Sequence, residues 1–298
     1  MPASISAPRR YAVLDVFADR PGAGNPLAVV LDGDGLNEAQ MQAIAQWTRL
    51  PETTFVQPAA DAQASYRIRM FSPRREVVFA GHPSVGTAAA MLDAGLATPR
   101  GGLLLQDGAA GRLPLQVETD PHGARIISVR TPRARVAEVA TPIDPRLKHA
   151  LKGIVQGALP PVLMDGGRRW WLAEVRDEAS LRSTRVDWIA IAGLASATDA
   201  MGLCLFTRAD AGADYDIVVR AFVGAPAQFE DAASGAANAT LAGWLRERSR
   251  LPHADGRYRV SQGREVGHDA RLQLRVDADG EVWSGGRVVS VVRGELHW

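Results

Sequence analysis

Two short stretches of the chain place a titratable side chain beside the predicted start of a helix. Residues 80–86 read AGHPSVG and contain His82, and residues 230–236 read EDAASGA and contain Asp231. An imidazole and a carboxylate that meet in one site set each other's pKa, so they can act as acid and base near neutral pH. The pair therefore predicts a proton-transfer site. Either residue alone is more typical of a helix cap or a packed side chain.

The start of each predicted helix also favours an anion. Unpaired backbone N–H groups and the positive end of the helix dipole lie there. We expect Gly81 and Ser84 in one helix, and Ser234 and Gly235 in the other, to bind a substrate carboxylate. Neither stretch has the spacing of a nucleotide-binding loop. The alternative is that the glycines only permit tight packing.

The two stretches occupy matching places in an internal repeat. A shift of 149 residues brings Tyr66 onto Tyr215 and places His82 opposite Asp231 in a 298-residue chain. Two halves that share a strand, a turn and a small-residue helix predict two similar domains that face each other, with the site between them. A chance match inflated by small residues is the alternative.

Short strands and two helices rich in Ala and Gly must position these residues. The helices are expected near residues 82–94 and 234–246, and small side chains on several of their faces indicate that backbone surrounds them closely. We predict an α+β fold of two pseudo-symmetric domains, each a strongly curved, mostly antiparallel sheet wrapped around a central helix. The domains are expected at 1–133 and 134–285, with the tail 286–298 packing back on the first.

The segments that alternate or run apolar like strands are spread through both halves. They are 11–17, 27–31, 53–57, 65–71, 102–106, 113–117, 125–129, 170–174, 202–207, 216–222, 257–260, 272–276 and 288–296. Asn37, with Gln40 three residues later, predicts a capping box at the start of a further helix.

Composition excludes several classes of function. The net charge of +1 offers no long-range attraction for nucleic acid. The single cysteine, Cys204, excludes an intrachain disulfide and any mechanism that needs two thiols, and its apolar surroundings predict a buried, inert thiol. No apolar run approaches the roughly 20 residues of a membrane span. No secretory leader is legible, and no His and Cys cluster predicts a metal. We therefore expect a cytoplasmic protein without a membrane partner.

Segments throughout the chain resemble the phenazine-biosynthesis PhzF family, which has the diaminopimelate epimerase fold. The resemblance implies two pseudo-symmetric domains, a homodimer, no metal or organic cofactor, and proton-shift isomerisation of a small carboxylated substrate. The matching segments are Asp15–Phe17, Gly24–Val30, Met41–Ala45, Glu52–Val56, Arg69–Pro73, Gly81–Pro83 and Glu230–Gly235.

Two departures from the family pattern bear on the mechanism. The resemblance implies a catalytic Glu at the position of Trp47, and a substrate-contacting Ser at the position of Ala236. Because an indole cannot abstract a proton from carbon, Trp47 cannot perform the role that the resemblance implies for a Glu at this position. We expect Trp47 to form a wall of the substrate pocket, Ala236 to border the substrate, and catalysis to proceed through His82 and Asp231.

Three functions remain open. The leading hypothesis is a cofactor-independent PhzF-like isomerase or epimerase that acts on a small carboxylated metabolite, either cyclic or open-chain. The second is an inactive metabolite-binding or regulatory protein that retains the family cleft. A hydrolase ranks last because no Ser-His-Asp arrangement is legible. Glu52 and Glu76 also match family residues, and we interpret both as structural hydrogen-bonding groups.

Overall fold

The chain divides into two units, each of which is described by itself. The structure is a computed structural model that describes residues 7–59, 61–139, 145–225 and 227–298. Unit 1 extends to Arg130 and includes Gly285–Trp298, and unit 2 is Thr131–Ser284. Each unit therefore contains one of the two stretches with a predicted catalytic residue.

Unit 1 is a curved sheet with one buried helix. Its elements are β1 (Arg9–Val16), β2 (Asn25–Val30), α1 (Glu38–Thr48), β3 (Glu52–Gln57), β4 (Tyr66–Phe71), β5 (Glu76–Val77), α2 (Gly81–Asp93), β6 (Leu103–Gly108), β7 (Gly111–Thr119), β8 (Arg125–Thr131) and β18 (Val288–Leu296). Strand β1 pairs antiparallel with β2 and with β18, so the end of the chain lies beside its beginning. The ladder continues through β3 and β4 to β6, β7 and β8, and β2–β3 and β4–β6 are its parallel pairs.

Helix α2 lies against this sheet along its whole first part. Every residue from Gly81 to Met91 is buried, and α2 contacts β1, β2, β3 and β18. Gly86 explains why a small residue is required there. A Cβ added at Gly86 would lie 2.5 Å from Leu27 Cδ2 and 2.7 Å from Val16 Cγ2, and both of these side chains are fully buried. The small residues that we took as a sign of enclosing backbone therefore permit close packing of α2 on β1 and β2.

We expect Gly86→Ala to lower the free energy of unfolding by about 1–3 kcal/mol, because the added methyl overpacks a rigid core. Gly193, inside helix α5, is the matched control, since nothing lies within 4 Å of a Cβ added there. Gly193→Ala should be stabilising by up to about 1 kcal/mol through helix propensity. Urea denaturation of both variants checks this, and equal effects of the same sign would contradict the packing argument.

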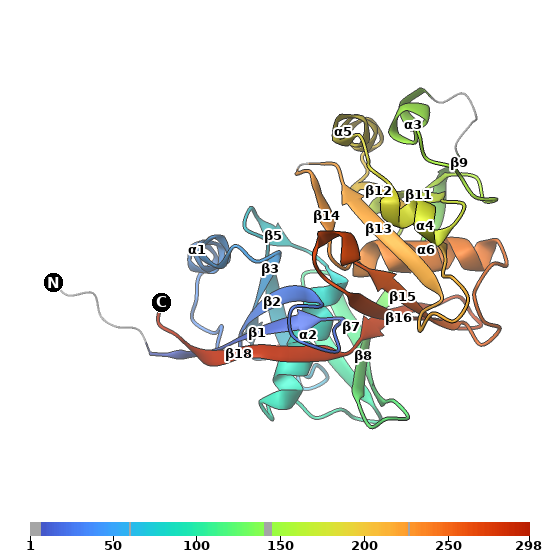
Figure 1. The fold of residues 1–298 in the computed structure, drawn as a ribbon. Helices are drawn as coiled ribbons and strands as arrows, with labels where there is room; N and C mark the ends of the chain where they lie inside the picture. Colours follow the sequence, from blue (N-terminus) through green and yellow to red (C-terminus); the bar gives the residue numbers. More distant parts are fainter. Residues whose placement is uncertain (1–6, 60, 140–144, 226) are drawn as a thin grey trace. The chain divides into compact units, whose positions relative to one another are not determined.

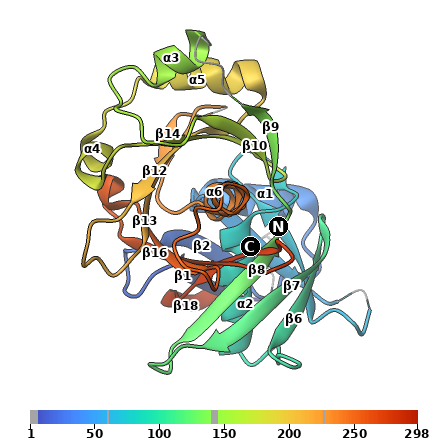
Figure 2. The same cartoon turned by 90° about the vertical axis from the view of Figure 1, so that its right-hand side faces the viewer.

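Unit 2 repeats the same plan. Its elements are β9 (Arg135–Val139), α3 (Pro145–Ala150), β10 (Val162–Asp165), β11 (Arg169–Glu174), α4 (Glu178–Ser183), α5 (Trp188–Thr198), β12 (Gly202–Arg208), β13 (Ile217–Val223), β14 (Phe229–Asp231), α6 (Gly235–Glu247), β15 (Arg257–Gln262), the 3₁₀ turn η1 (Arg264–Val266), β16 (Ala270–Val276) and β17 (Val282–Gly286), whose last residues belong to unit 1. Figure 2 shows α6 end-on, enclosed by the strands of unit 2. Helix α6 contacts β9, β10, β11 and β16, so it is the central helix of this unit.

Strand pairing follows the same order in the two units. The series β1-β2-β3-β4-β6-β7 in unit 1 corresponds to β10-β11-β12-β13-β15-β16 in unit 2, with β5 and β14 as short antiparallel partners of β4 and β13 (Figure 1). The pairs β2–β3 and β11–β12 are parallel in the two units. The pairs β4–β6 and β13–β15, which come before and after the central helix in the sequence, are parallel as well. The predicted α+β fold of two similar halves, each wrapped around a helix, is confirmed.

The register that we predicted for the repeat is wrong. Tyr66 begins β4, whereas Tyr215 precedes β13, which begins at Ile217. Arg69 and Arg220 instead occupy equivalent places, because each pairs with a carboxylate on the short partner strand. The helices α2 and α6, of 13 residues each, begin at Gly81 and Gly235.

This correction changes which residue is equivalent to His82. Counted from the helix starts, His82 is the second residue of α2 and corresponds to Ala236, the second residue of α6, rather than to Asp231. The connection between strand and helix is longer in unit 2, which shifts the register between β13 and α6. Runs of Ala and Gly match one another in several registers, so the two halves of the sequence can be aligned in the wrong register.

Several local predictions are confirmed. Helix α1 begins with the expected capping box, in which Asn37 Oδ1 accepts from the Gln40 N–H and Gln40 Oε1 accepts from the Asn37 N–H. Cys204 is fully buried, and burial raises the pKa of its thiol to about 12, so the thiol stays protonated. No helix in the described residues has the length and apolarity needed to cross a bilayer.

Candidate functional site

The candidate site in unit 1 is centred on His82, which is only 7% exposed at the start of α2. Its imidazole hydrogen-bonds to the backbone of Pro26, and proline offers only a carbonyl for this. Nε2 has no hydrogen-bond partner, so Nδ1 donates to that carbonyl. Glu52 Oε2 lies 3.5 Å from Nε2. The imidazole is therefore held on one side by backbone and faces a carboxyl group on the other.

The parallel pairing of β2 and β3 produces this arrangement. Leu27 is the ladder partner of Glu52, so Pro26, one residue earlier on β2, lies beside the first residue of β3. Helix α2 packs on both strands and brings His82 to them. Three segments that are far apart in the sequence thus meet at the same end of the parallel pair.

His82 is neutral throughout the physiological range. Burial lowers the pKa of His82 to about 3, although the hydrogen bond to the Pro26 carbonyl acts in the opposite direction. The contact with Glu52 is therefore an approach of a neutral imidazole to a carboxyl group rather than an ion pair. With its proton on Nδ1, the ring presents the Nε2 lone pair to the Glu52 side. Such a lone pair can accept a hydrogen bond from the carboxyl group once that group is protonated.

We expect the buried His82 to make the protein less stable as the pH falls from about 6.5 towards 3. In that window the unfolded chain binds a proton at His82 and the folded chain does not. The contribution of His82 to the free energy of unfolding therefore falls by about 1.4 kcal/mol for each unit by which the pH is lowered. His82→Asn keeps an N–H donor for Pro26 but does not titrate. The stability difference between wild type and His82→Asn should therefore shift by about 2 kcal/mol between pH 7 and pH 5 in urea denaturation. A difference independent of pH would contradict the burial argument.

Glu52 is the functional candidate that sequence reasoning missed. We interpreted it as a structural hydrogen-bonding group, and the structure places its carboxyl beside His82, with 19% of the side chain exposed. An acid that remains in part accessible and contacts a buried imidazole has the geometry of a proton-transfer group. The chain therefore has an acid at this site although position 47 is a tryptophan.

Trp47 lies near the end of α1, a helix on the outside of unit 1 (Figure 1). It is 65% exposed, and its indole contacts Trp298 with ring centroids 6.2 Å apart. No contact of Trp47 with His82 or Glu52 occurs among the described interactions. That Trp47 walls a substrate pocket stays a prediction.

The first turn of α2 has no side-chain cap, since its N-cap residue is Ala80. The backbone N–H groups of the turn that begins at Gly81 are thus not taken by a cap. Ser84 differs, because its hydroxyl donates to the Ala80 carbonyl at 3.1 Å and accepts from Gln106 Nε2 at 3.0 Å. Ser84 is fully buried, so its hydroxyl holds the turn together. The Ser84 hydroxyl is therefore engaged within the helix and with the sheet.

The candidate residues in unit 2 lie on either side of a strand-to-helix connection. Asp231 ends β14, and its Oδ1 accepts from the Ala233 N–H at 3.3 Å. The N-cap of α6 is Ser234, whose hydroxyl accepts from the Ala237 N–H at 3.3 Å. Asp231 thus belongs to the strand before the helix and precedes the N-cap residue Ser234 in the sequence, so it lies near the helix start but is not its cap. Gly235 and Ala236 are the first two residues of α6.

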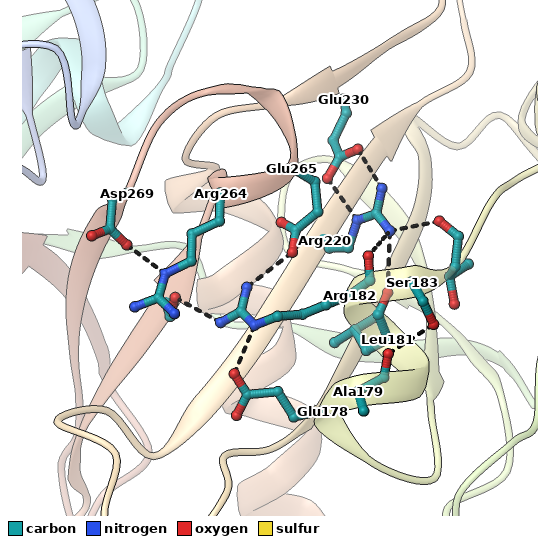
Figure 3. Close-up of polar contacts among 12 residues, drawn as sticks. Glu178, Ala179, Leu181, Arg182, Ser183, Arg220, Glu230, Arg264, Glu265 and Asp269 are labelled. Carbon is teal, nitrogen blue, oxygen red and sulfur yellow. Dashed lines mark hydrogen bonds and ion pairs between the residues drawn. The ribbon is translucent and has the colours of Figure 1, made fainter.

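Both units fix the short strand before the central helix with an arginine. Arg220 on β13 binds Glu230 on β14 through two hydrogen bonds of 2.8 Å each (Figure 3). Arg69 on β4 binds Glu76 on β5 in the same way, through two hydrogen bonds of 2.7 Å. The interpretation of Glu76 as a structural hydrogen-bonding group agrees with this geometry.

A family model described as phenazine biosynthesis-like protein, PhzC-PhzF, matches residues 14–294. The chain belongs to this family. The segments that suggested the resemblance all lie within the matched region, as do the candidate residues of both units.

Relatives of known name extend over almost the whole chain. Trans-2,3-dihydro-3-hydroxyanthranilate isomerase of Pseudomonas aeruginosa is 32% identical over 91% of this chain and 92% of its own length. Antisense-enhancing sequence 1 of Schizosaccharomyces pombe is 28% identical over 96% of this chain and 97% of its own. Several relatives are named as isomerases or epimerases.

A solved structure shares the fold. The phenazine biosynthesis protein of the PhzF family from Bacillus anthracis superposes with a TM-score of 0.83 at 25% identity and covers 98% of this chain and 99% of its own. This likeness agrees with the two-unit α+β architecture described above.

Proposed function

We propose that the protein is an isomerase that moves a proton between two carbon atoms of a small carboxylated metabolite, without an organic cofactor. The observation that carries this proposal is the contact between Glu52 and the buried, neutral His82. A carboxylate backed by an imidazole lone pair can remove a proton from carbon and pass it on or return it. Membership of a family that includes named isomerases supports the same chemistry.

In the proposed reaction Glu52 removes a proton from one carbon of the substrate. The electron pair of that C–H bond moves into the conjugated system, and a proton is delivered at a second carbon, so that only the position of hydrogen and of the double bond changes. Nε2 of the neutral His82 accepts a hydrogen bond from Glu52 once the carboxyl group is protonated, and so orients it. Asp231 of unit 2 is a further proposed proton-handling group.

The proposed substrate carries a carboxylate. The uncapped first turn of α2 and the start of α6 at Gly235 and Ala236 are the proposed anion-binding elements, because unpaired helix N–H groups favour negative charge. The Ser234 hydroxyl caps the helix by accepting from the Ala237 N–H. The related isomerase of Pseudomonas aeruginosa is named for a cyclic carboxylic acid, which supports a small cyclic acid here. Trp47 as a pocket wall, a homodimer and a cytoplasmic location remain parts of this proposal.

Solvent deuterium exchange tests the proposal. The protein is incubated in D₂O with a panel of small unsaturated carboxylic acids, and mass spectrometry follows the gain of one deuterium in recovered substrate or product. Exchange at carbon that requires the protein supports an isomerase. Binding of an acid without any exchange would favour the alternative, an inactive metabolite-binding protein.

A further inference from the structure

Gln262, the last residue of β15, is fully buried beside the connection that carries Asp231. Its Nε2 donates to the Asp231 carbonyl at 2.8 Å. Its Oε1 accepts from the Ser234 N–H at 3.2 Å and from Asn238 Nδ2 at 2.8 Å. One side chain thus binds the end of β14, the N-cap of α6 and the first turn of that helix.

We propose that Gln262 is the positioning residue for Asp231, because it fixes the backbone between Asp231 and Ser234. This inference rests on the proposed function, in which Asp231 handles a proton. Gln262 acts through the backbone of that segment.

The three hydrogen bonds allow only one orientation of the amide. The Gln262 amide oxygen must face the N–H donors of Ser234 and Asn238, and its NH₂ group must face the Asp231 carbonyl. A carboxylate at position 262 would accept from Ser234 and Asn238 but would turn an acceptor towards the Asp231 carbonyl. An apolar side chain would remove all three hydrogen bonds and take the Gln262 acceptor away from the buried Ser234 N–H. The segment is therefore sensitive to the chemistry of this residue, beyond its size.

A charged network holds the residues on both sides of Gln262 in the sequence. The neighbouring Ser261 hydroxyl accepts from Arg182 at 3.2 Å. Arg182, in α4, also binds Glu178 at 2.7 Å and Glu265 of η1 at 2.9 Å (Figure 3). The end of β15 and the turn that follows it are thus tied to α4. This anchorage lets Gln262 act as a fixed point for the connection before α6.

Asp231 is restrained from its other side as well. Its neighbour Glu230 is bound by Arg220, whose remaining nitrogen donates to the carbonyls of Leu181 and Thr184 at 3.1 and 2.7 Å (Figure 3). The side chain before Asp231 and the carbonyl of Asp231 itself are therefore both fixed. A group that must meet a substrate in one geometry requires a backbone fixed in this way.

Unit 1 uses a related but weaker contact. Gln106 on β6 donates through Nε2 to the Ser84 hydroxyl of α2, and Ser84 and Asn238 are each the fourth residue of their helix. Gln106 Oε1 has no hydrogen-bond partner, whereas Gln262 uses both ends of its amide. The additional bonds in unit 2 all go to the connection that carries Asp231, so they are specific to that segment.

Gln262→Met and Gln262→Glu test this inference in the full-length chain, with Gln273→Glu on the neighbouring strand β16 as the matched control. Hydrogen exchange of the backbone amide of Ser234 is measured first, because it needs no substrate. We expect Gln262→Met to raise its exchange rate at least about tenfold, while amides in the centre of α6 stay protected. Circular dichroism checks that the variants are folded. If Gln262→Glu does not fold, the measurements on Gln262→Met still test the inference.

Turnover in the solvent-exchange assay is the second measurement. We expect kcat of Gln262→Met to fall at least about tenfold with KM changed less than about threefold, and Gln273→Glu to match the wild type. Unchanged protection of Ser234 in a folded variant would overturn the inference, and so would lost protection with full turnover. If the wild type itself exchanges no substrate, the proposed function fails, and the amide measurement still decides whether Gln262 holds the segment.

Discussion

Glu52→Gln should reduce turnover in the solvent-exchange assay by at least about 100-fold, and by up to about 10⁴-fold, while leaving the fold intact. General acid–base groups contribute factors of this size. The amide keeps the shape of the side chain and can donate to His82 Nε2, which now has no hydrogen-bond partner. It cannot take a proton from carbon, so the loss should appear in kcat, with a much smaller change in KM.

Glu38→Gln is the control for this variant. Glu38 lies in the same unit, and its side chain is 72% exposed and paired with Arg69. The same chemical change there should alter kcat by less than about twofold. Equal turnover in Glu52→Gln and Glu38→Gln would show that Glu52 takes no part in catalysis, and the proposed mechanism would have to be abandoned.

Local signals in the sequence were sufficient for most of the fold. The capping box at Asn37 and the small residues of the two central helices report on contacts within a few residues or on close packing, and both appear in the structure. The order of short strands also identified two similar halves. These features depend on periodicity and residue size, which a single sequence records directly.

Register and contacts between distant segments were not available from the sequence. The shift of 149 residues aligned Tyr66 with Tyr215, yet only Tyr66 lies in a strand. An insertion between β13 and α6 is invisible when both flanks are rich in Ala and Gly. The equivalence of His82 and Asp231 failed for this reason, although each residue does lie close to the start of a central helix.

Glu52 shows the same limit at the site. By itself it is an acid at the beginning of a strand, which is ordinary. Its contact with His82 arises from the parallel pairing of β2 with β3 and from the packing of α2 on both strands. Trp47 is largely exposed, whereas Glu52, five residues later, makes the contact with His82.

The second large effect is expected in the pair of Arg220 and Glu230. Arg220→Met should lower the free energy of unfolding by about 3–5 kcal/mol, since it leaves a buried carboxylate without a partner. The two side chains are 8% and 7% exposed. The variant would also remove the donor that serves the carbonyls at the end of α4. Urea denaturation followed by circular dichroism measures the loss.

The equivalent pair in unit 1 is a control built into the chain. Arg69 and Glu76 make the same two-bond contact, but their side chains are 22% and 31% exposed, and water can solvate the carboxylate when its partner is removed. Arg69→Met should therefore cost about 1–2 kcal/mol, well below Arg220→Met. If the two variants lose equal stability, burial is not what distinguishes these pairs. A larger loss for Arg220→Met, together with faster amide exchange at Ser234, would show that the strand before α6 is held by this ion pair and that the setting of Asp231 depends on it.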